Sequence, residues 1–225
     1  MLRVGEGILS HAFVDLVLAT VSVYNKETYA AKHPQNWAEF WGTKAFPGPR
    51  ALPNMVSGQP ALEFALLADG VAPGKLYPVD LPRAFKALTR IRASVPKFWD
   101  TGALSAQLLS DKEVMLGARW SGRVQTIIDT GAPLAIEWNQ NTIQIEAYGM
   151  PKNTRDMKPD QLFVDFTSQA SAQAGYSKDL ATGLLISTPT TCCRRSCWRS
   201  CRAGRNIVRW VFTRISTGGK ITATK

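Results

Sequence analysis

The pattern of apolar and polar positions divides most of the chain into alternating strand-like and helix-like segments. Short apolar or alternating runs predict buried strands at 18–24 (LATVSVY), 113–120 (EVMLGARW), 133–138 (PLAIEW) and 142–150 (TIQIEAYGM). Apolar residues at helical spacing predict helices within 37–41, 60–70, 80–99, 121–131 and 159–183. Strands that alternate with helices are typical of an α/β sandwich with a largely parallel sheet.

Residues with special backbone or side-chain properties predict where these helices begin and end. Asn36, followed three positions later by Glu39, has the form of a capping box. Asp80 is placed to cap the helix after it. Gly70 and Gly131 follow apolar-periodic segments, where glycine commonly terminates a helix.

The helical spacing also predicts which side chains face the core. Phe85, Leu88 and Ile91 are expected on the inner face of one helix, and Val124, Ile127 and Ile128 on the inner face of another.

The positive charge is concentrated at the end of the chain. The 225 residues carry a net charge of +10, but positions 180–225 hold nine lysines or arginines and no acid. All four cysteines also lie there, at Cys192, Cys193, Cys197 and Cys201. The sequence therefore divides into a nearly neutral, cysteine-free body and a basic tail at 187–225.

The tail has several interpretations. Its cysteine spacing is unlike a paired zinc site, a body without cysteine argues against a disulfide framework, and basic residues would bind phosphates only non-specifically. When the third base of each codon is read with the first two bases of the next, Cys192–Cys193 must encode leucine, and allowed codon choices spell YDLLPEELLAKLP across 190–202 and QDFDWW across 213–219. We therefore interpret the tail as a frameshift product without packed structure or tight metal binding. A basic nucleic-acid-associated protein acting through this tail is the alternative function.

Motifs for catalysis or cofactor binding are missing. His11 and His33 lack a nearby carboxylate–nucleophile pattern, and GEGILS (5–10) lacks the third glycine and the preceding strand of a dinucleotide fingerprint. No enzyme activity, metal or cofactor is expected. The apolar run 12–23 is interrupted by Asp15 and is shorter than the ~20 residues of a membrane span. We expect no membrane span, and no convincing signal peptide is recognised.

A series of segments matches one transport family in order. They are NWAEFWGTKAFPGPRAL, LEFALLADGVAPGKLYPVDLPRAFKAL, AQLLSDKEV, ARWSGRVQTIIDTGAPLAIEWNQ and MPKN, between Asn36 and about Ser171. The sequence resembles the polyamine-type (spermidine/putrescine) extracellular solute-binding proteins of ABC transporters. This resemblance implies a periplasmic protein of the type II binding-protein fold, in which two doubly wound α/β lobes close on a cationic solute for delivery to a permease.

The resemblance also implies a domain organisation. Members of the family are usually longer, with a lobe before the strand that matches VSVYN (21–25). We expect an N-terminal segment with a hinge strand at 1–31, one complete lobe at 32–139, and the return strand and helices of a partial second lobe at 140–186. A fragment of this kind is expected to bind a polyamine weakly, because a cleft gains affinity from two walls.

Four residues are candidates for solute binding. In ARWSG, Trp120 matches the aromatic residue that lies against the solute, and in IQIEAYGMP, Glu146 matches an acid that faces the cleft. An aromatic face attracts an ammonium group, and a carboxylate adds a charge-assisted hydrogen bond. Ser121 and Tyr148 are neighbouring candidates. Core packing for Trp120 and solvation for Glu146 remain alternatives. Polyamine-specific members carry acids where ALPNMVSGQP (51–60) has none.

Overall fold

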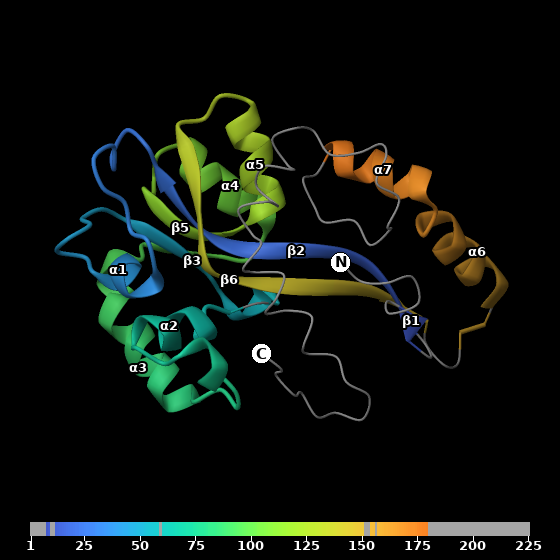
Figure 1. Cartoon of the computed structure of the whole chain (residues 1–225), viewed down its shortest axis with the longest axis horizontal. Coiled ribbons are helices and arrows are strands. Elements are labelled where there is room, and N and C mark those ends of the chain that lie inside the picture. The colour runs from blue at the N-terminus through green and yellow to red at the C-terminus, as the bar shows by residue number, and fades with distance from the viewer. Residues whose placement is uncertain (1–7, 10–11, 59, 151–153, 156, 180–225) are drawn as a thin grey trace. The chain divides into compact units, whose positions relative to one another are not determined.

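The computed structural model describes residues 8–9, 12–58, 60–150, 154–155 and 157–179 (Figure 1). The predicted tail at 187–225, with its four cysteines, lies outside these residues. Residues 20–142 form one compact unit, and the described residues on either side form a second one. Each unit is described by itself, and the lobe boundaries expected at 32 and 139 stay a prediction.

A mixed sheet organises the chain. Its order is β1-β2-β5-β3-β4, and β6 pairs with β2. β3 is parallel to β4 and to β5, whereas β2 is antiparallel to β5. The prediction of a largely parallel sheet therefore holds for the three adjacent strands β5, β3 and β4 and not for β2. The strands are β1 (Ile8–Leu9), β2 (Ala12–Asn25), β3 (Arg50–Pro53), β4 (Lys97–Trp99), β5 (Leu116–Trp120) and β6 (Leu134–Gly149).

Helices connect and cover these strands. They are α1 (Trp37–Trp41), α2 (Leu62–Ala68), α3 (Leu81–Ile91), α4 (Gly102–Ser110), α5 (Ser121–Asp129), α6 (Met157–Thr167) and α7 (Ala170–Asp179), with short 3₁₀ helices η1 (Met55–Ser57), η2 (Pro73–Lys75) and η3 (Arg92–Ser94). In residues 20–142, α1–α3 lie on one face of the sheet and α4 and α5 on the other (Figure 1).

The local predictions of helix ends are confirmed. The side chain of Asn36 accepts a hydrogen bond from Glu39 N at 2.8 Å, and Asp80 accepts one from Arg83 N at 3.1 Å. Gly70 and Gly131 have φ values of +82° and +98°, which glycine adopts without strain. The capping box is altered at one point. The Glu39 carboxylate accepts from Gln35 N, at 2.9 Å, instead of from the capping residue itself.

Predictions that depend on tertiary packing were less accurate. The sequence patterns missed β3, β4 and α4, and split the continuous strand β6 into two. On α3 the buried stripe consists of Ala84, Ala87 and Ile91, while Phe85 is 50% exposed, so its predicted inward orientation was wrong. The buried stripe runs through positions 84, 87 and 91, and α3 contacts α2, so Phe85 lies off the stripe by helical geometry and is exposed. On α5, Val124 is buried as predicted.

A buried arginine holds the loop between α1 and β3. Arg50 begins β3 and is fully buried. Its Nε donates to Phe40 O at 2.8 Å and its Nη1 to Gly48 O at 2.6 Å, and its Nη2 donates to Phe46 O. The guanidinium thereby satisfies one carbonyl group at the end of α1 and two in the turns that follow it, and such groups are costly to leave unpaired when buried.

We expect Arg50→Met to destabilise the protein by roughly 2–4 kcal/mol, because it removes charged hydrogen bonds and leaves buried carbonyls without donors. Urea unfolding followed by tryptophan fluorescence measures this change. Lys44→Met is the matched control, since Lys44 is an exposed cation in the same loop. Equal stabilities of the two variants would contradict the assigned role of Arg50.

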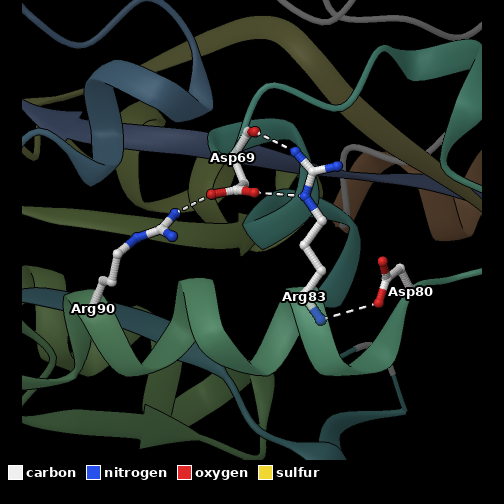
Figure 2. A network of polar contacts seen from close by, with 4 residues as sticks. All are labelled: Asp69, Asp80, Arg83 and Arg90. Carbon is white, nitrogen blue, oxygen red and sulfur yellow. Dashed lines mark hydrogen bonds and ion pairs between the residues drawn. The ribbon is translucent and has the colours of Figure 1, made fainter.

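Figure 2 shows the ion-pair network that fastens α3 to the end of α2. Asp69 follows the last residue of α2 and accepts hydrogen bonds from Arg83 Nε at 2.6 Å and from Arg90 Nη2, while Arg83 Nη2 donates to the Asp69 carbonyl at 2.8 Å. The hydrogen bonds from Arg83 and then Arg90 hold the pKa of Asp69 below its ordinary value. The charged carboxylate therefore stabilises the fold above the ordinary pKa of about 4, and this contribution is lost as the pH falls through the lowered pKa of the folded state.

Asp69→Asn should lower Tm at pH 7, and the difference from the wild type should shrink below about pH 4, where the unfolded chain binds a proton at this carboxyl. Thermal melts between pH 2.5 and about 7 test both parts. Asp111→Asn is the control, because Asp111 also follows a helix, α4, and forms no ion pair among the described residues. A pH-independent effect of Asp69→Asn would exclude the ion-pair explanation.

Candidate functional site

The three parallel strands end at one edge of the sheet. β3, β4 and β5 end at Pro53, Trp99 and Trp120, and because they are parallel, these ends lie on the same side. The backbone N–H of Asn54 donates to Trp99 O at 2.9 Å, which joins the first two ends. The sequence folds this way locally because a capping residue follows β3 and β4: Asn54 caps η1, and Thr101 caps α4.

This edge contains a topological switch point. After β3 the chain turns to α2 on one face of the sheet, and after the adjacent β5 it turns to α5 on the other (Figure 1). Open α/β sheets bind ligands outside the carboxyl ends of strands at such a point, because the diverging loops leave a crevice there. Trp120 and Ser121, both predicted as candidates, are the last residue of β5 and the first of α5.

Trp120 is held in place by other aromatic and small residues. Its ring meets the Trp99 ring edge-on, with centroids 5.2 Å apart and planes at 81°. Trp99 is itself fixed, since its Nε1–H donates to Ala118 O at 3.0 Å. A Cβ added at Gly102 would lie 3.1 Å from the Trp120 ring, so the start of α4 packs directly against it. Trp120 nevertheless stays half-buried, whereas Ser121 is buried. The site can therefore present a fixed aromatic surface.

A second buried arginine lies beside this tryptophan, and sequence reasoning missed it. Arg119 is fully buried, and its Cζ lies 5.6 Å from the centroid of the Trp99 ring. Its Nε and Nη2 are buried and have no hydrogen-bond partner, and Nη1 makes one long contact of 3.4 Å with Ala118 O. Burial lowers the pKa of Arg119 to about 9, so the group is charged at neutral pH. The only available signal was an arginine two positions after a glycine within a buried strand.

The turn after β3 adds an apolar rim to the same edge. The Asn54 side chain accepts from Val56 N at 2.8 Å and from Ser57 N at 3.1 Å. This turn leaves Met55 and Val56 exposed by 64% and 82%. Sequence reasoning missed this rim as well, because η1 is short.

The other two candidates belong to the second unit. Glu146 and Tyr148 are two positions apart on β6, so both point to one side of the strand. Glu146 is exposed, and the half-buried Tyr148 ring packs edge-on against Phe163 of α6 with centroids 5.4 Å apart. The four predicted residues therefore form two pairs, one in each unit.

A histidine–carboxylate pair lies away from this edge. His33 stacks on Tyr24 with centroids 4.1 Å apart, and its Nε2 lies 3.2 Å from Glu137 Oε2. Burial, and then the Glu137 charge, raise the pKa of Tyr24. Tyr24 pairs with Leu116, at the start of β5, so the cluster is at the opposite end of that strand from Trp120. The carboxylate near His33 is 104 positions away in the sequence, where no local motif could reveal it.

Comparisons with known proteins agree with this geometry. The profile of the family described as bacterial extracellular solute-binding proteins matches residues 12–191. This chain belongs to that family. The gamma-aminobutyric acid (GABA)-binding protein of Pseudomonas aeruginosa is 33% identical to this solute-binding protein over 172 residues, which are 74% of this chain and 48% of the relative.

Two solved structures extend the comparison. A GABA receptor is 31% identical with a TM-score of 0.72, and the match covers 78% of this chain and 54% of the receptor. The binding protein MotA of A. tumefaciens, in complex with glucopine, is 31% identical with a TM-score of 0.72, and the match covers 80% of this chain and 56% of MotA. This solute-binding protein thus spans about half the length of the relatives that it matches.

These findings confirm the predicted fold class, and they place the chain in a family of solute-binding proteins and not of enzymes. They match solute-binding proteins of ABC transporters and do not support the alternative nucleic-acid function. Within the described residues, no helix has both the length and the apolar character to cross a bilayer, and no group of three or more His, Cys, Asp or Glu side chains could hold a metal ion.

Gly102→Ala should displace the Trp120 ring, because the added Cβ would lie 3.1 Å from two ring carbons. Overpacking of this kind costs about 1–3 kcal/mol. Near-ultraviolet circular dichroism and the position of the Trp120 indole N–H signal in NMR spectra report the displacement. Gly74→Ala is the control, since its Cβ would meet nothing within 4 Å. Spectra and stabilities that are equal in the two variants would show that Gly102 does not position the ring.

Proposed function

We propose that this solute-binding protein captures a small solute with an ammonium group at one end and a carboxylate at the other, such as GABA, for import by an ABC transporter. The observation that carries this proposal is the half-buried Trp120 at the switch point of the sheet. Relatives that match this chain across that region are named for GABA or were solved with an opine, glucopine. Action in the periplasm, together with a permease, belongs to the same proposal.

The residues at this edge suggest which groups of such a solute they would contact. The Trp120 face would cover the methylene groups and attract the ammonium group, an interaction of about 0.5–2 kcal/mol. We keep the exposed Glu146 carboxylate as the proposed partner of the ammonium group, as the family resemblance implies. Ser121 and Tyr148 remain neighbouring candidates.

A polyamine is the competing solute, because it shares the aliphatic chain and one ammonium group. It would bring a second ammonium group in place of the carboxylate, and that group would need an acid of its own. Asn54–Ser57, at the rim of the Trp120 edge, contains no acid, and neither does the rest of 51–60. Asp100, which follows β4 at the same edge, is exposed and would be a weak partner for a second ammonium group. The acid-free turn after β3 therefore favours a solute with one ammonium group over spermidine or putrescine.

GABA and putrescine have equal numbers of carbon atoms and differ at one end, so they form a matched pair for titration. We expect GABA to shift the indole N–H signal of Trp120 more strongly than putrescine does. Binding to this chain is expected to be weak, since a single wall buries little of a ligand. Titration to about 50 mM detects dissociation constants well above 1 mM.

Trp120→Ala should weaken GABA binding about 2- to 30-fold, the loss expected for a cation–π contact. Glu146→Gln should weaken it by up to about fivefold, as for an exposed ion pair, whereas the control Glu113→Gln should not. For Trp120→Ala, binding is followed on the GABA resonances. Stronger binding of putrescine than of GABA would establish the polyamine alternative, and no signal change with either solute would reject both.

A further inference from the structure

We propose that Arg119 determines the charge selectivity of the Trp120 edge, because its buried guanidinium favours a solute carboxylate there and disfavours a second ammonium group. This inference rests on the proposed function, since it concerns the same solute. Arg119 acts through its electric field, without touching the solute.

The two buried arginines of this unit differ in their partners. Both Arg50 and Arg119 are fully buried. Arg50 donates to three carbonyl groups. The Nε and Nη2 of Arg119 are unpaired, and no carboxylate forms an ion pair with it among the described residues. Burial of a charge without hydrogen bonds is destabilising, so Arg119 costs stability where Arg50 provides it.

The surroundings of Arg119 are shaped to hold a guanidinium. A Cβ at position 117 would lie 3.0 Å from its Cζ and Nε, so Gly117 leaves the space that the group occupies. The Trp99 ring beneath it supplies a cation–π contact, with Cζ 5.6 Å from the centroid. Natural proteins break folding rules, such as the pairing of buried charges, mainly at functional positions, and other parts of the structure compensate for the cost. A charge selector is a function that an unpaired buried cation can perform.

The charge is close enough to act on a solute at Trp120. The Trp99 ring contacts both Arg119, at 5.6 Å, and the Trp120 ring, at 5.2 Å. At about 10 Å and an effective dielectric constant of about 20, a unit charge changes an equilibrium roughly tenfold, upward for a carboxylate and downward for an ammonium group.

Other charges at this edge do not cancel the effect. Asp100 follows β4 and is exposed, so water and salt screen its charge. Arg123, on the first turn of α5, is an exposed cation whose Cγ lies 3.4 Å from the Cβ position of Gly102. The buried Arg119 is thus the least screened of the three charges.

The test is the ratio of the GABA and putrescine dissociation constants in the full chain, measured by NMR titration. The neutral variants Arg119→Met and Arg119→Gln should weaken GABA binding and strengthen putrescine binding, so that the preference for GABA falls at least tenfold. Lys97→Gln is the control, because Lys97 is an exposed cation at the other end of β4 from Trp99, and it should change the ratio less than threefold because distance, water and salt screen its charge.

Opposite changes in the two affinities distinguish selection by charge from a structural role, which would weaken both solutes together. Thermal melts confirm that the variants fold, and Arg119→Met is expected to be at least as stable as the wild type because it removes an unpaired buried charge. An unchanged ratio in both neutral variants would overturn the role of Arg119 and leave the proposed function intact. No binding of either solute by the wild type would instead reject the proposed function itself.

Discussion

β3 is four residues long and fully buried, and it pairs in parallel with β4 on one side and with β5 on the other. Parallel pairing requires crossover connections, and here these connections are the helices α2, α3 and α4. Because both neighbours run in the direction of β3, all three strands end at one edge. The turn that carries Asn54 and the strand end at Trp120 meet there for this reason.

The aromatic residues at this edge form a connected group. Trp99 ends β4, donates to a backbone carbonyl of β5, and contacts both the Arg119 guanidinium and the Trp120 ring. A displacement of β4 would therefore change all of these contacts. Trp120 can remain half exposed and still be rigid, because Trp99 and the start of α4 support it. A fixed aromatic surface loses little conformational entropy when a solute binds.

The two buried arginines show that burial alone does not define the role of a charge. Arg50 is surrounded by carbonyl oxygens that need donors, so it stabilises a loop. Arg119 lies over an aromatic ring and fills the space that Gly117 leaves, and no carboxylate among the described residues forms an ion pair with it. The same side chain can thus support the fold at one end of a sheet and create an electric field at the other end.

The sequence by itself determined the features that depend on contacts between near neighbours. Asn36, Asp80 and Gly70 act on backbone groups a few residues away, so their patterns predicted the ends of α1, α2 and α3 correctly. The order of matching segments also identified the family, with Trp120 as a candidate. Tertiary structure alone decided which residues are buried and with what partners. β3 and β4 are too short to show a period of their own and form only by pairing. The Nε and Nη2 of Arg119 lack hydrogen-bond partners because of its tertiary surroundings, which include the Trp99 ring, and no local sequence pattern encodes the absence of a partner.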